Sequence, residues 1–273
     1  MHTACRPASS HGTWLVPPAP TPCDPQGRPL NKPQNRPKWR LIAFPYAGGS
    51  ATVYRNWPAR LGESIDLLAL QLPGRGARFA EAPISDFSHL VRAVADALQA
   101  RPQTLPTAFF GHSLGALLAF EVACELAARG APQPQMLLLS GRAAPAAGLP
   151  TVLRECRTDA DFIAELQRLQ GTPREVLDAP DLLALLMPTI RADFALLHSW
   201  RARPGAVWDG PIVALAGRRD PHVPLAAVDA WAGHAGGRFE RLNYAGGHFF
   251  LHEQEREVVR DVALRLHDLG VVA

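Results

Sequence analysis

The chain has 273 residues, a formal net charge of +3 and an apolar fraction of 47%. This length and apolar content are enough to bury one sizeable core, and they exclude a fibrous or wholly disordered protein. The segment up to Lys38 holds five of the Lys and Arg residues and a single acid, Asp24, so the remainder is close to neutral. A nucleic-acid-binding domain needs a basic surface on its folded part, and we therefore expect no nucleic-acid partner.

Cysteine usage and hydropathy define the expected compartment. The four cysteines form no CxxC pair and show no spacing typical of metal ligands: Cys5, Cys23, Cys124 and Cys156. They are typical of reduced thiols in a cytosolic protein. No stretch resembles a transmembrane span, and the apolar patch 14–16 is too short for a signal-peptide core. We expect a cytoplasmic protein with no membrane partner, no metal and no cofactor of its own.

Residues 1–38 contain nine prolines and little periodic apolar content. Such a segment cannot bury enough surface to offset the entropy of ordering, so we expect a disordered, Pro-rich tail. The alternative is a docking peptide that a partner recognises in extended form.

Residues 39–273 alternate short apolar runs with longer amphipathic segments. The apolar runs predict buried parallel strands near 41–44, 67–70, 107–110, 136–139, 212–215 and 239–242. Helices are expected around 90–98 and over 114–128. The alternation predicts a mostly parallel α/β sheet with helices on both faces.

The alternation stops between about 150 and 203, where apolar residues at helical spacing continue with no strand between them. We expect an inserted helical lid here, with hinges at Gly171, Pro173, Pro180 and Pro188. Spacing alone does not distinguish a lid from a fixed layer of helices.

The first chemical motif is Gly111-His112-Ser113-Leu114-Gly115, placed between an expected strand and an Ala- and Leu-rich helix. This order is typical of the nucleophile elbow of α/β-hydrolases, in which a strained turn exposes the serine hydroxyl. Ser113 is the predicted nucleophile, and His112 is interpreted as a packing residue.

A serine hydroxyl needs a base that a carboxylate orients. In this fold the acid and the base follow the serine in the order Asp, His. Asp220 follows the strand expected at 212–215, and His248 follows the last strand through two glycines. His252 is the one rival base, and it is disfavoured because it falls inside the next helix.

Acyl transfer also needs backbone donors for the oxyanion. The Leu114 amide, directly after the nucleophile, is one predicted donor. The Ala47 amide, in the Gly-rich loop after the first strand, is the other. A plain turn with no catalytic donor is the alternative for that loop.

At this point the domain resembles the type II thioesterases of polyketide and nonribosomal peptide assembly lines. The resemblance covers residues 39–266 and rests on FPYAGGS at 44–50, QLPGR at 71–75, FE at 120–121, SGRAAP at 140–145, GTP at 171–173, MPTIRAD at 187–193 and GGHFFL at 246–251. Leu114 replaces the family's usual methionine, and Gln170 a usual glycine.

The resemblance implies an α/β-hydrolase fold and hydrolysis of acyl thioesters from the phosphopantetheine arm of acyl or peptidyl carrier proteins, the editing of stalled chains. The arm belongs to the substrate, and we expect a monomer. Two alternatives stay open: a chain-releasing thioesterase or general esterase or lipase, and a catalytically inactive binding module.

Overall fold

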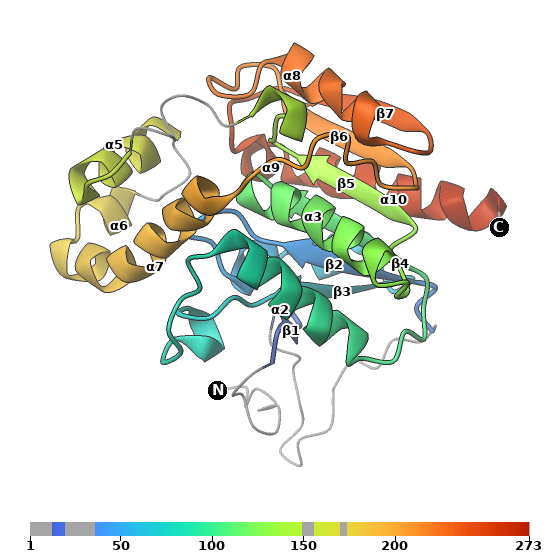
Figure 1. Cartoon of the computed structure of the whole chain (residues 1–273), viewed down its shortest axis with the longest axis horizontal. Coiled ribbons are helices and arrows are strands. Elements are labelled where there is room, and N and C mark those ends of the chain that lie inside the picture. Colours follow the sequence, from blue (N-terminus) through green and yellow to red (C-terminus); the bar gives the residue numbers. More distant parts are fainter. Residues whose placement is uncertain (1–12, 20–35, 149–155, 170–173, 273) are drawn as a thin grey trace.

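A seven-stranded sheet forms the centre of the molecule in a computed structural model that describes residues 13–19, 36–148, 156–169 and 174–272 (Figure 1). The strands are β1 (Leu15–Val16), β2 (Trp39–Phe44), β3 (Ile65–Leu70), β4 (Thr107–His112), β5 (Met136–Ser140), β6 (Ile212–Gly217) and β7 (Phe239–Tyr244). Their order is β1-β3-β2-β4-β5-β6-β7, and every pairing is parallel except that of β1 with β3. This is the α/β-hydrolase architecture that was predicted.

The central strands β4, β5 and β6 are buried at every residue, which explains their continuous apolar runs. The last strand, β7, was also expected to be buried, but most of its residues are only half-buried. It is the edge strand of the sheet, and an edge is covered less completely than the centre.

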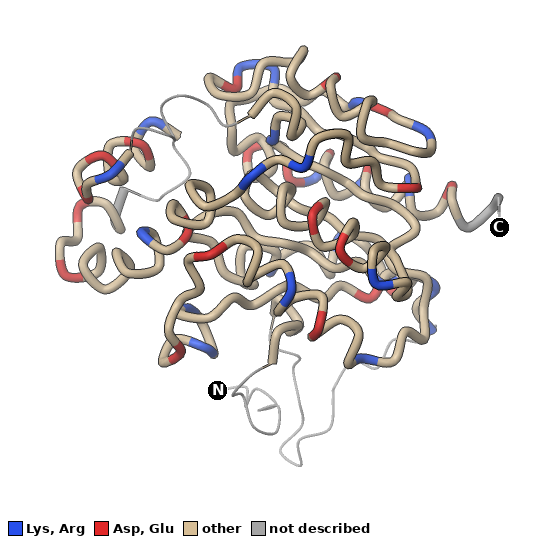
Figure 2. Tube along the Cα trace, viewed as in Figure 1, with Lys and Arg blue, Asp and Glu red and all other residues tan. Residues whose placement is uncertain are grey.

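Helices cover both faces of the sheet (Figure 1). One apolar cluster joins the sheet to α2 (Phe87–Gln99), α3 (Leu114–Ala128) and α8 (Leu225–Asp229). A second joins the opposite face to α1 (Trp57–Leu61), α9 (Phe250–Glu253) and α10 (Glu255–Val272). Short 3-10 turns lie at η1 (Ala51–Tyr54), η2 (Gly76–Arg78), η3 (Pro145–Ala147) and η4 (Ala230–His234). Charged residues of both signs are interspersed over these elements (Figure 2).

The segment expected to form a lid contains α5 (Asp159–Leu169), α6 (Arg174–Leu177) and α7 (Pro180–Ser199), which extend to one side of the sheet (Figure 1). Residues 149–155 and 170–173, and with them the GTP motif and Gln170, lie outside the described residues. Alone among the described helices, α7 has the length and mean hydropathy (1.3) of a membrane span. The apolar side chains that it packs against the core and against α5 account for part of that composition, and Leu182 and Leu185 are exposed.

The N-terminal segment differs from its prediction over residues 13–19. Leu15 pairs with Leu70 in the antiparallel strand β1, is 4% exposed and belongs to the main core. The Trp14 carbonyl accepts a hydrogen bond from the Gln71 amide at 2.7 Å, and the Arg78 guanidinium lies 4.1 Å from the Trp14 ring centroid. The prediction of a disordered tail is therefore wrong for these residues. β1 forms because β3 has an open edge with which it can pair, and a strand of two residues is too short to be recognised from the spacing of its apolar residues. The rest of the predicted tail, 1–12 and 20–35, lies outside the described residues.

Candidate active site

The turn from β4 into α3 is strained at Ser113. Its φ of 54° makes it the one non-glycine residue with positive φ in the described part of the chain. A Cβ atom on Gly111 would lie 2.2 Å from the Gly115 carbonyl oxygen, and one on Gly115 would lie 2.1 Å from the Phe44 carbonyl oxygen. Both positions therefore need glycine, and the structure forms the predicted elbow geometry.

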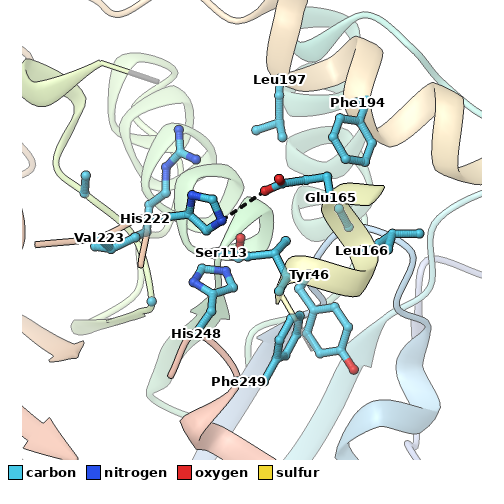
Figure 3. Close-up of a pocket in the computed structure, with 15 residues that line it drawn as sticks. Tyr46, Ser113, Glu165, Leu166, Phe194, Leu197, His222, Val223, His248 and Phe249 are labelled. Atoms are coloured by element: carbon cyan, nitrogen blue, oxygen red, sulfur yellow. Dashed lines mark ion pairs between the residues drawn. The ribbon is translucent and has the colours of Figure 1, made fainter. Parts of the chain in front are cut away.

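Asp220 and His248 come together although 28 residues separate them. The Nδ1 atom of His248 lies 2.6 Å from Asp220 Oδ2. The other carboxylate oxygen, Oδ1, accepts hydrogen bonds from the His222 and Val223 amides at 2.9 and 3.2 Å. Because a carboxylate accepts, Nδ1 carries the proton and Nε2 is left with its lone pair. His248 lines the same cavity as Ser113, and Figure 3 draws the two side by side.

The other two histidines near the elbow have different partners. The His112 ring is fully buried, with Nδ1 2.9 Å from Ser140 Oγ, and burial lowers its pKa well below the usual range, with a smaller effect from His248 and His252. His252 Nε2 lies 2.9 Å from the Tyr46 hydroxyl. Neither contacts Asp220 in the described residues, which fits the packing role predicted for His112 and the preference for His248 over His252.

The two amides predicted to stabilise an oxyanion form no hydrogen bond with the described residues. The neighbouring Gly48 and Gly49 amides donate to Asp193 Oδ2 at 2.6 Å and to the Tyr46 carbonyl at 2.9 Å. In the part of the chain that the structure describes, no acceptor pairs with the amides of Ala47 or Leu114. Ala47 and Ser113 line one cavity, and Leu114 directly follows Ser113, so both amides remain available to a ligand.

The cavity itself is small and mainly apolar. Its volume is about 40 Å³, and its walls include Tyr46, Leu166, Phe194, Leu197, Val223 and Phe249. Burial raises the pKa of Tyr46 to about 12, so this phenol stays neutral. A space of this size holds about three waters and suits a short acyl group. Among the described residues, no group of His, Cys, Asp and Glu side chains is placed to hold a metal ion.

Two polar side chains in the wall, Glu165 and His222, were missed from the sequence. Glu165 Oε1 on α5 lies 3.0 Å from His222 Nε2, and both side chains are almost fully buried (Figure 3). Arg168 donates to His222 Nδ1 at 2.7 Å. An arginine has only donors, so Nδ1 accepts and the imidazole proton sits on Nε2, facing Glu165. Nothing in the sequence neighbourhood of His222 indicates a partner 57 positions away.

A buried ion pair fixes the oxyanion loop. Arg75, in the loop after β3, donates to both carboxylate oxygens of Asp193 on α7 at 2.7 Å, and also to the Gly49 carbonyl at 3.1 Å. Asp193 in turn holds the Gly48 amide. The Thr189 hydroxyl donates to the Gly74 carbonyl at 2.9 Å, which ties α7 to the same loop. An aspartate in an apolar helix indicates a buried partner, but not which one.

This fold and this cavity are typical of an enzyme of the α/β-hydrolase class. The family model described as "Thioesterase domain" matches residues 39–266. The thioesterase PikA5 of Streptomyces venezuelae is 39% identical over 224 residues, which cover 82% of this chain and 79% of PikA5.

Two solved structures are similar over nearly their whole length. The type II thioesterase BorB from the borrelidin biosynthetic cluster superposes with a TM-score of 0.77 at 36% identity, covering 93% of this chain and 98% of BorB. YbtT, a type II thioesterase from the yersiniabactin NRPS/PKS pathway, gives 0.77 at 30% identity, covering 91% and 96%. The chain belongs to the thioesterase family, and this membership and the two type II thioesterase structures support its being a thioester hydrolase.

Proposed function

We propose that this thioesterase hydrolyses acyl thioesters from the phosphopantetheine arm of acyl or peptidyl carrier proteins, as an editing enzyme of polyketide or nonribosomal peptide biosynthesis. The observation that carries the proposal is the Asp220–His248 pair at 2.6 Å, whose imidazole shares a cavity with the strained Ser113. The similarity to free-standing type II thioesterases such as BorB and YbtT supports the substrate class.

In the proposed reaction, Ser113 Oγ attacks the thioester carbonyl carbon while its proton passes to His248 Nε2. The negative charge that develops on the carbonyl oxygen accepts hydrogen bonds from the Ala47 and Leu114 amides. Collapse of the tetrahedral intermediate breaks the carbon–sulfur bond, and His248 returns the proton to the departing pantetheine sulfur. Asp220 stabilises the imidazolium in both steps.

Hydrolysis of the acyl enzyme repeats the sequence with water. His248 takes a proton from the attacking water, the second tetrahedral intermediate collapses, and the proton goes to Ser113 Oγ as the carboxylic acid leaves. These steps need no metal and no cofactor beyond the arm that the substrate carries. The proposal includes action as a monomer in the cytoplasm, where carrier proteins are loaded.

Release of acyl groups from loaded carrier proteins tests the proposal directly. We expect turnover of acyl carrier proteins at a kcat/KM far above that for a simple aryl ester of the same acyl group, and none with Ser113→Ala. A general esterase would prefer the aryl ester. An inactive binding module would leave Ser113 unlabelled by a fluorophosphonate probe.

A further inference from the structure

Arg142 is a charged residue in the wall of the acyl cavity that the reaction does not use. It lies in the loop directly after β5, two residues past Ser140, whose carbonyl accepts the hydrogen bond of the Ser113 amide at 2.8 Å. The residue is 4% exposed and lines the cavity together with Ser113 and His248.

The Arg142 guanidinium has no anionic partner in the part of the chain that the structure describes. Its buried Nε has no hydrogen-bond partner, and no carboxylate in the described residues forms an ion pair with it. Its one aromatic neighbour is Trp200, whose ring centroid is 5.9 Å from Cζ. Arg75 is buried to a similar degree (7% exposed), and its Nε also has no partner in the described residues, but its two terminal nitrogens pair with the Asp193 carboxylate.

A buried charge without a counter-ion is costly in a folded protein. Burial lowers the pKa of Arg142 to about 10, which still leaves it protonated near neutral pH. The cation–π contact at 5.9 Å satisfies none of the N–H groups. The described residues therefore supply no counter-ion for this guanidinium.

We propose that Arg142 forms an anion subsite of the acyl cavity, and that its ligand is a carboxylate carried by the acyl group of the thioester. The inference rests on the proposed function and names its substrate class. A guanidinium binds a carboxylate through two parallel hydrogen bonds, which neither water nor a neutral acyl chain reproduces.

Position in the fold favours the acyl group over the phosphate of the arm as the source of this anion. The pantetheine arm is about as long as six extended residues, roughly 20 Å, so its phosphate lies far from the scissile bond. Arg142 is buried beside the nucleophile. The small cavity, about 40 Å³, suits a short dicarboxylic chain. Glu165 in the same wall is compensated by Arg168, at 3.0 Å, and does not repel the ligand as a free charge would.

The test compares malonyl, succinyl and glutaryl thioesters of N-acetylcysteamine with neutral acyl thioesters of the same chain length. This thiol carries no phosphate, and Ser113→Ala supplies the blank for spontaneous hydrolysis. We expect the ratio of kcat/KM for anionic over neutral acyl groups to fall about tenfold or more in Arg142→Met, at the chain length that wild type prefers. Arg142→Lys should retain part of the preference.

Arg129→Met is the matched control, because Arg129 directly follows α3 and pairs with Asp96 and Glu125. It should keep the wild-type ratio. An unchanged ratio in a folded Arg142→Met at all three lengths would overturn the proposal. So would a loss that appears only when phosphopantetheine thioesters are compared with pantetheine thioesters, because the anion would then be the phosphate of the arm.

A binding measurement separates this inference from the proposed function. Isothermal titration calorimetry of butanoate and butanamide needs no turnover, and it works on wild type even if Arg142→Met fails to fold. We expect wild type to bind butanoate at least about tenfold more tightly than butanamide. Equal binding of the two overturns the subsite, whereas absent turnover with selective butanoate binding overturns only the proposed thioesterase reaction on carrier proteins.

Discussion

Two helices cover the same cavity, and they are held in different ways. α7 is joined to the catalytic domain by the Arg75–Asp193 pair, whose side chains are 7% and 0% exposed, and its Leu196 and Leu197 belong to the main core. α5 places Phe162 and Leu166 in a separate small cluster, and its polar link to the domain is Glu165 with His222. The inserted segment is thus two units, a wall built into the core and a cover resting on it.

The difference follows from what each contact buries. Removing one partner of a buried, bidentate ion pair leaves an uncompensated charge in the interior, which is strongly destabilising. The contact of α7 with α5 through Arg191 and Asp159 is largely exposed, at 59% and 43%, and such pairs contribute little. Because α7 has residues in the main core and α5 has none, we expect α7 to open only with the domain and α5 to open at lower cost.

The largest effect is expected in the fixed half, at the nucleophile. Ser113→Ala should reduce kcat by about a million-fold, because no other hydroxyl occupies the elbow. Initial rates on acyl carrier protein measure this, and far-UV circular dichroism should show an unchanged fold. Residual activity above a few per cent, in protein free of contaminating hydrolase, would place the nucleophile elsewhere.

The second largest effect is expected at the predicted acid and base, Asp220 and His248. Asp220→Asn should lower kcat by about 10⁴-fold, because an amide in that place favours the wrong imidazole tautomer of His248. His252→Ala is the comparison variant and should cost much less, since His252 hydrogen-bonds the Tyr46 hydroxyl. A larger loss from His252→Ala than from His248→Ala would reverse the assignment of the base.

The fixed wall itself is tested by Asp193→Asn, which leaves the Arg75 guanidinium short of its counter-ion. We expect the free energy of unfolding to fall by about 3 kcal/mol, measured by urea denaturation, together with a loss of kcat as the Gly48 amide is released. Asp159→Asn removes the exposed pair between α5 and Arg191 of α7 and should change neither quantity measurably. Equal effects of the two substitutions would contradict the distinction between wall and cover.

The smallest effect is expected for Glu165→Gln in the cover. Burial raises the pKa of Glu165, but the contacts with His222 and Arg168 lower it more, so its pKa lies below the usual range. A lowered pKa gives stability that is present above the unfolded-state pKa of about 4.3 and is lost as the pH falls through the folded-state value. The free energies of unfolding of wild type and Glu165→Gln should therefore differ by about 1 kcal/mol at pH 7 and become equal near pH 3.

Hydrogen exchange gives the same substitution a second readout. In Glu165→Gln, amides of α5 should exchange faster while those of α7 keep their wild-type rates. Faster exchange in both helices to the same extent would mean that the inserted segment opens as one unit. That result would contradict the distinction between α7 as a fixed wall and α5 as a cover.

Local chemistry explains why much of the site could be predicted from the sequence. The elbow needs glycine at 111 and 115 because a Cβ at either position would lie about 2 Å from backbone atoms. The turn can therefore be predicted from five adjacent residues. The helix at Leu114–Ala128 has the expected bounds, and Asp220 follows β6, which its apolar run identifies. His248 follows β7, which was predicted at 239–242 although two of those four residues are charged. The order of these elements along the chain is enough to bring the pair together at one edge of a parallel sheet.

Only the tertiary structure shows the contacts between segments that are far apart in the sequence and that no common sequence pattern connects. Arg75 pairs with Asp193, 118 positions away in the sequence, and His222 pairs with Glu165, 57 positions away. Both contacts form because the inserted segment folds back over the strand ends. Burial of Arg142 without a partner likewise depends on how the loop after β5 packs, and β1 forms because β3 has an open edge. Pairing of charges in a low-dielectric interior is set by three-dimensional proximity, and a single sequence records which residues are charged but not which of them meet.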